Sequence, residues 1–144
     1  MKKLTVILLL FVSTNIIGQN NGSFVIGCDE SFFVMYRDTI FSFPIPDRFY
    51  IAFEGGFDDT LEVYLNGVLI SKEFYKTNPV LGTTGGKLFL KNKKNAISNI
   101  LLIKNTSRNH CLEFSIDTRF RIIYIDFEED KWGVFYSNKF TIYE

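Results

Sequence analysis

The strongest local signal of fold class is the stretch Leu61-Glu62-Val63-Tyr64-Leu65-Asn66-Gly67-Val68-Leu69-Ile70. Leu61, Val63 and Leu65 alternate with polar or amphipathic residues, which is typical of a strand with one buried face. Asn66-Gly67 follows, and Asn-Gly suits a type I′ turn because both central residues of that turn need positive φ. The stretch therefore predicts a β-hairpin whose alternate apolar residues face a core.

The rest of the chain has the same character. It contains 16 Phe, 7 Tyr and one Trp, whereas alanine occurs only at Ala52 and Ala96. Aromatic and β-branched residues favour strands, and alanine is the best helix former. Short apolar runs, about ten of them, are separated by turn residues, and a domain of this kind closes as two packed sheets. We therefore predict an all-β fold, a two-sheet antiparallel β-sandwich of the jelly-roll or immunoglobulin-like type.

Three local features refine this expectation. A two-residue turn at Arg37-Asp38 would join strands at 32–36 and 39–43, and residues 74–85 have the composition of a long loop. A final hairpin is expected between 132–136 and 140–143, around Ser137-Asn138.

The N-terminus has the order of a secretory signal. Lys2 and Lys3 precede an apolar run from Leu4 to Val12, and a short polar stretch ends at the small residue Gly18. The apolar run is shorter than the ~20 residues that a membrane-spanning helix needs. We expect a cleaved signal peptide at 1–18, a single domain at 19–144, no transmembrane segment, and export to the periplasm or the extracellular space.

The charge balance argues against two classes of partner. Lys2 and Lys3 are the only charged residues of the first 18, so residues 19–144 hold 14 basic and 16 acidic residues, a net charge of −2. Nucleic-acid binding requires a basic face, and anionic membranes attract polybasic segments. We therefore expect neither a nucleic-acid partner nor electrostatic binding to a membrane.

Cys28 and Cys111 are the only cysteines. In an exported domain an even number of cysteines favours a disulfide, which here would connect the start of the domain to a late strand. Two reduced, buried thiols are the alternative, because cysteine is among the most buried residue types.

A lipid anchor is a third interpretation of Cys28. Val25-Ile26-Gly27-Cys28 resembles the lipobox of bacterial lipoproteins, in which the cysteine is lipidated. The polar residues 19–23 separate it from the apolar run, a departure from that pattern which argues against lipidation.

No constellation of catalytic residues is evident. His110 is the only histidine, and the chain lacks a Gly-x-Ser-x-Gly elbow, a His-Glu-x-x-His motif and a P-loop. A dyad of His110 with Cys111 is poorly placed, because neighbouring residues of a strand point to opposite faces. We therefore expect no enzymatic activity and no catalytic residue.

Carboxylates suggest one metal site. Glu54, Asp58 and Asp59 surround Gly55-Gly56 between two predicted strands, and carboxylate oxygens on a flexible loop can bind calcium. The alternative is an acidic loop in contact with solvent. Calcium is the only cofactor that the sequence indicates.

Several aromatic residues lie near predicted turns or at the alternating strand positions that are otherwise polar. Exposed Tyr and Trp provide flat, amphipathic contact area for partners. The candidates for ligand binding are Tyr64, Tyr75, Trp132 and Tyr136. The alternative is that these rings pack in the domain with only their polar ends in water.

The segment Asp58–Leu69 resembles the strand–turn–strand unit of laminin-G-like and other carbohydrate-binding jelly rolls. The overall plan is similar to small, mostly uncharacterised exported β-sandwich proteins of Gram-negative bacteria. These resemblances imply a non-enzymatic binding module for a glycan or another protein. The alternatives are a structural or assembly component of the cell envelope, pairing through open sheet edges, and an inhibitor or immunity-type protein.

Overall fold

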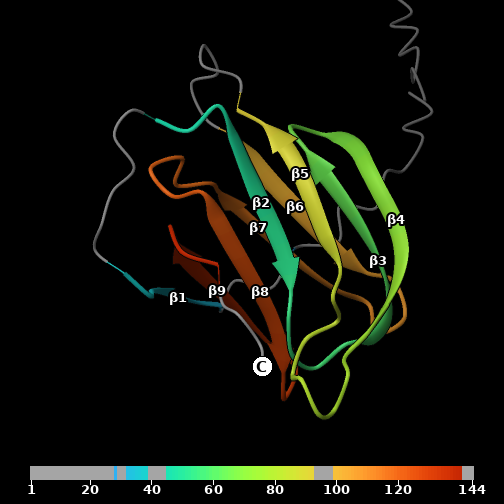
Figure 1. Ribbon diagram of the computed structural model, residues 1–144. Coiled ribbons are helices and arrows are strands. Elements are labelled where there is room, and N and C mark those ends of the chain that lie inside the picture. Colours follow the sequence, from blue (N-terminus) through green and yellow to red (C-terminus); the bar gives the residue numbers. More distant parts are fainter. Residues whose placement is uncertain (1–27, 29–31, 39–44, 93–98, 141–144) are drawn as a thin grey trace, which may run out of the picture.

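The computed structural model describes Cys28 and residues 32–38, 45–92 and 99–140 (Figure 1). The predicted signal peptide at 1–18 and the strand expected at 39–43 lie outside the described residues. The described part of the chain contains strands and no helix.

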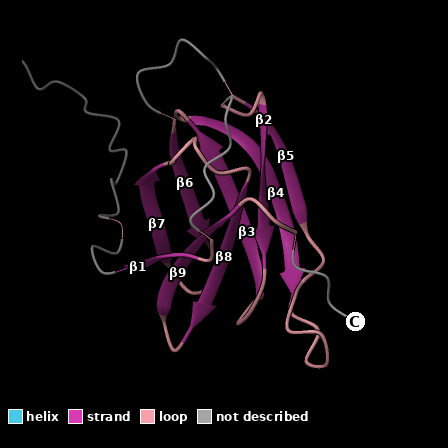
Figure 2. Cartoon of the chain, turned by 60° about the vertical axis from the view of Figure 1, so that its left-hand side comes forward, coloured by secondary structure: helices cyan, strands magenta, loops and turns pink. Residues whose placement is uncertain are grey.

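Two packed sheets form the domain, as Figure 1 and Figure 2 show from two sides. The five-stranded sheet has the order β1 (Phe32–Tyr36), β9 (Lys131–Ser137), β8 (Ile122–Glu128), β2 (Arg48–Phe53), β5 (Lys87–Lys91). The four-stranded sheet has the order β4 (Val68–Lys76), β3 (Asp58–Leu65), β6 (Ile100–Asn105), β7 (His110–Ser115). The prediction of an all-β, two-sheet sandwich is confirmed.

Most of the strand pairs are antiparallel, as expected, but two are parallel. β1 runs parallel to β9, and β2 runs parallel to β8. Both pairs join strands that are far apart in sequence, so no tight turn fixes their relative direction. β1 pairs with β9 in the described structure, and the second strand of the hairpin predicted around Arg37-Asp38 lies outside the described residues.

The hairpin at 61–70 is confirmed. Asn66 and Gly67 both have positive φ, 51° and 78°, as the turn requires. Leu61 and Val63 are fully buried and Leu65 packs against the core at its border. β4 extends beyond the expected hairpin to Lys76, so assigning residues 74–76 to a loop was wrong.

The last hairpin is also different from the prediction. β9 pairs antiparallel with β8 rather than with residues 140–143, which lie largely outside the described residues. The turn is Glu129-Asp130, and both residues adopt positive φ, 50° and 58°. The turn thus has the backbone of a type I′ turn without the Asn-Gly signature that would reveal it.

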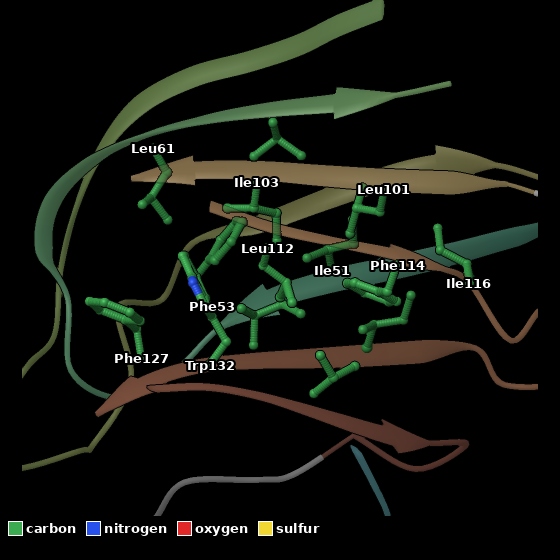
Figure 3. Close-up of a cluster of buried hydrophobic side chains, with 14 of the residues drawn as sticks. Ile51, Phe53, Leu61, Leu101, Ile103, Leu112, Phe114, Ile116, Phe127 and Trp132 are labelled. Carbon is green, nitrogen blue, oxygen red and sulfur yellow. The ribbon is translucent and has the colours of Figure 1, made fainter. Parts of the chain in front are cut away.

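The core lies between the sheets (Figure 3). Leu61, Ile103 and Leu112 project from the four-stranded sheet towards Phe53 and Trp132 of the five-stranded sheet. In β7 the expected alternation holds, because Leu112 and Phe114 are buried and Glu113 is exposed.

A disulfide between Cys28 and Cys111 closes one edge of the sandwich, with Cα atoms 4.7 Å apart. Beside it, the rings of Phe32 in β1 and Phe114 in β7 lie 6.0 Å apart and join the two sheets. The predicted disulfide is confirmed. Both cysteine sulfurs take part in this bond.

Candidate functional site

The outward face of the five-stranded sheet carries one aromatic side chain from each strand. We call this set the aromatic row; in sheet order it comprises Phe33, Phe135, Tyr124, Tyr50 and Phe89. Phe135 is directly opposite Tyr124 across β9 and β8, and Tyr50 is directly opposite Phe89 across β2 and β5. Neighbouring strands lie about 4.8 Å apart. The row crosses the whole sheet obliquely, because Phe33 lies opposite Gly133 rather than Phe135 and Tyr124 lies opposite Ala52 rather than Tyr50.

Edge-to-face contacts hold the two ends of the row. The rings of Phe33 and Phe135 are 5.4 Å apart at 84°, and those of Tyr50 and Phe89 are 4.8 Å apart at 81°. Gly133 makes the first contact possible, because a Cβ there would come within 2.6 Å of the Phe33 ring. The outermost rings remain accessible, with Phe33 46% and Phe89 68% exposed.

Arg37 covers the centre of the row. Its guanidinium lies 4.5 Å from the ring centroid of Tyr124 and 4.6 Å from that of Phe135. It also donates two hydrogen bonds to the carboxylate of Glu54, at 3.2 and 2.7 Å. A bidentate Arg–carboxylate pair is directional as well as charged, so Arg37 is fixed over the rings.

Carboxylates surround a hollow of about 330 Å³ at the Phe33 end of the row. Phe33 and Phe135 line it together with Asp126, Glu128, Glu129 and Lys131. Asp126 accepts a hydrogen bond from the Gly55 amide at 3.0 Å. Burial raises the pKa of the Asp126 carboxyl, and the negative charges of Glu54 and Glu128 add to this effect. A cation placed in the hollow would relieve this repulsion.

The other end of the row is partly covered by the chain itself. Phe140 packs edge-on against Tyr50, with ring centroids 5.3 Å apart, and Lys87 Nζ lies 5.7 Å from the Phe140 ring centroid. Tyr124 donates a hydrogen bond to the carbonyl of Lys139 at 3.2 Å. Only a hollow of about 20 Å³ remains here, so the acidic end offers the larger space.

Three of the four aromatic residues predicted to bind ligand are in the core. Trp132, Tyr75 and Tyr136 are buried, and their expected exposure was wrong. The Trp132 ring packs at a tilt against Phe127 and Phe57, and the Tyr75 ring packs at a tilt against Phe53. The reason is that each of these residues occupies a strand position whose side chain points towards the core. Burial also raises the pKa of the Tyr136 phenol to about 12.

Tyr64 is half-buried on the outward face of the other sheet. Its hydroxyl donates to Glu62 at 2.7 Å, and Lys104 Nζ lies 5.0 Å from its ring centroid. The hydrogen bond to the Glu62 carboxylate raises the pKa of the Tyr64 phenol. Tyr64 is therefore far from the aromatic row and already engaged with its own neighbours.

The three carboxylates predicted to bind calcium each face a different basic residue. Glu54 pairs with Arg37, Asp58 with Lys76 at 3.2 Å, and Asp59 with Arg108 at 3.1 Å. Asp58 and Asp59 are consecutive residues of β3, so they point to opposite faces. Within the described residues, no three His, Cys, Asp or Glu side chains are grouped so as to bind a metal ion.

His110 lies against Phe127, with ring centroids 5.3 Å apart, and the sulfur of Cys111 is part of the disulfide. The described residues therefore place no thiol beside the imidazole.

The aromatic row could not be predicted from the sequence because most of β2 and the first half of β8 are apolar on both faces. In Phe49-Tyr50-Ile51-Ala52-Phe53 the inward and outward residues are equally hydrophobic, so no alternation separates them. The signal that was available is this continuous apolar character in a sandwich strand, which indicates a covered or ligand-binding outer face.

The chain matches no known family model, and no curated protein or solved structure is significantly similar to it. Over the described residues we find no helix that is long and apolar enough to cross a membrane.

Proposed function

We propose that this protein is an exported, non-enzymatic binding module that holds a partner protein across the aromatic row. The observation that carries the proposal is the hollow at its acidic end, where Phe33 and Phe135 meet Asp126 and Glu128. Aromatic rings bind cations through their faces, and carboxylates bind them by charge and hydrogen bonding. The preferred partner is therefore an extended segment with a lysine or arginine for the hollow and apolar side chains for the row.

Two further features support a protein partner. The row is made mainly of phenylalanine, which has no group to hydrogen-bond a sugar hydroxyl, whereas exposed aromatic rings dominate the energetics of protein interfaces. The fixed pair of Arg37 and Glu54 gives the centre of the row a polar group that is already oriented before a partner binds.

The test is binding of residues 19–144 to an array of short synthetic peptides that vary in basic and apolar residues, with a glycan array in parallel. We expect peptides with lysine or arginine beside apolar residues to bind. The double variant Asp126→Asn, Glu128→Gln should weaken this binding by about tenfold, the equivalent of one lost charged contact.

Matched controls are available on the four-stranded sheet. Phe33→Ala should weaken peptide binding, whereas Ile100→Ala, which removes a side chain of similar exposure (42% against 46%), should not. Glu113→Gln neutralises an exposed carboxylate of β7 and should also have no effect. Binding to glycans alone would replace the protein partner by a sugar, and equal effects of target and control variants would overturn the proposed site.

A further inference from the structure

Among the described strands, the edge strand β4 has one open side. It spans nine residues at the end of the four-stranded sheet, and β3 is its only neighbour among the described strands. Such an edge exposes unpaired N–H and C=O groups, which can pair with a further strand.

The hydrogen-bond pattern identifies the groups at this edge. Thr77 N donates to Phe57 O at 2.8 Å, and hydrogen-bonded residues alternate along an antiparallel pair. Ser71, Glu73 and Tyr75 therefore bond to β3. The peptide groups of the intervening residues, Lys72, Phe74 and Lys76, point to the open side.

Contacts between the sheets show which strands lie opposite each other. Phe32 and Phe114 place β1 opposite β7, and Phe53 and Tyr75, with ring centroids 4.4 Å apart, place β2 opposite β4. The order of each sheet then places β9 and β8 opposite β6 and β3. In this alignment β5 has no counterpart among the described strands of the four-stranded sheet.

Because no described strand lies opposite β5 in this alignment, its inner side is incompletely covered. Leu88 and Leu90 point towards the core and pack against it, yet both are only partly buried. Tyr75 covers the start of β5, because its ring is so close to Gly86 that a Cβ there would clash. An apolar strip at Leu88 and Leu90 thus lies beside the open edge of β4.

We propose that the position beside β4 and opposite β5 accepts an extended segment of another protein as the fifth strand of this sheet. Main-chain hydrogen bonds to Lys72, Phe74 and Lys76 would hold the segment, as in other cases of strand addition. Its alternate residues would be apolar and would cover Leu88 and Leu90. This surface is separate from the aromatic row and does not depend on the function proposed for it.

A second copy of this chain fits the position less well. Antiparallel pairing of two β4 strands over their full length sets Lys72 of the two copies opposite each other, and like charges in that arrangement are destabilising. The inward residues of β4 also include Ser71 and Glu73, which would not cover an apolar strip.

Amide hydrogen exchange tests the proposal on residues 19–144 with a probe peptide of alternating valine and threonine, capped by lysine. In the free protein the amides of Lys72, Phe74 and Lys76 should exchange much faster than those of Ser71, Glu73 and Tyr75. The peptide should slow the three edge amides. The same peptide N-methylated on the residues that bond to β4 should not slow them.

Two variants at one position separate backbone from side chain. Phe74→Pro removes an edge N–H and should weaken peptide binding about tenfold or more, whereas Phe74→Thr keeps the N–H and should bind nearly normally. Failure of the peptide to protect the edge amides would overturn the proposal. Slow exchange of these amides in the free protein would also overturn the proposal. If their protection grows with protein concentration, a second copy covers the edge. If it is constant, a segment of the same chain covers it.

Discussion

Arg37 donates to both carboxylate oxygens of Glu54 while its guanidinium lies on the ring of Tyr124. The pair connects the segment after β1 to the end of β2, although the two residues are 17 positions apart. The Glu54 side chain is almost completely buried, while that of Arg37 is 31% exposed. Arg37 thus supplies a positive charge next to the buried negative charge of Glu54.

Removing Arg37 should destabilise the fold. We expect Arg37→Met to lower the free energy of unfolding by about 2 kcal/mol, because the buried Glu54 carboxylate loses the cation with which it is paired. The loss is limited because Arg37 is itself partly exposed to solvent. The double variant Arg37→Met, Glu54→Leu should cost less than the sum of the single changes. Urea denaturation of the four proteins measures this coupling, and strictly additive losses would contradict it.

Removing the disulfide should cost more. The bond between Cys28 and Cys111 spans 83 residues, and the chain-entropy model assigns such a loop about 4 kcal/mol. The double variant Cys28→Ser, Cys111→Ser should therefore unfold at lower urea concentration. A reductant should lower the stability of the natural sequence to a similar value and leave the double variant unchanged. An equal effect of reductant on both proteins would show that its action is unrelated to this bond.

Gly56 and Gly67 provide a matched comparison. Both have positive φ, 77° and 78°, but a Cβ at Gly56 would lie 1.7 Å from the carbonyl oxygen of Phe127, whereas nothing lies near a Cβ at Gly67. Gly67→Ala should cost about 1 kcal/mol of unfolding free energy for backbone strain. Gly56→Ala should cost about 3 kcal/mol or more, because the backbone of β8 must move. Similar losses in thermal or urea unfolding would be inconsistent with the close packing of these two segments.

Ionisation of Asp126 should lower the stability of the fold as the pH rises, which is opposite to the usual effect of a carboxyl group in a protein. Its pKa is raised in the folded protein, chiefly by burial, so the folded state holds the proton more tightly than the unfolded state does. The resulting penalty is present at neutral pH and disappears as the pH falls through the raised pKa. Asp126→Asn, which keeps an oxygen for the Gly55 amide, should therefore be more stable than the natural sequence at pH 7, with a difference that vanishes in acid.

Asp117 serves as a control, because its pKa is shifted in the opposite direction to that of Asp126. Hydrogen bonds from Arg119 hold the pKa of the Asp117 carboxyl below its usual value. This group stabilises the fold above its unfolded pKa, and the contribution is lost as the pH falls through the folded pKa. Asp117→Asn should thus be less stable at pH 7. The same sign for both variants across a pH series of urea denaturations would refute the environments described for these carboxyls.

Much of the fold could be predicted from local pattern. The alternation Leu61-Val63-Leu65 and the turn Asn66-Gly67 specified the β3–β4 hairpin, because side-chain period and turn conformation are properties of a few adjacent residues. The disulfide followed from the number of cysteines and the predicted export. The positive φ values at Glu129 and Asp130 could not be predicted in the same way, because they are imposed by the pairing of β8 and β9 rather than by the residue types of the turn.

The sequence by itself determined that this chain forms strands and which residues of the clearly alternating strands face the core. It also favoured a bond between Cys28 and Cys111, which the structure contains. Tertiary structure alone decided that Trp132, Tyr75 and Tyr136 are buried and that Phe33, Phe135, Tyr124, Tyr50 and Phe89 form one row. The physical reason is that the row depends on the order and register of five strands, two of whose pairings are parallel and join distant parts of the chain. Such pairing is set by the packing of the whole domain, which no short stretch of residues encodes.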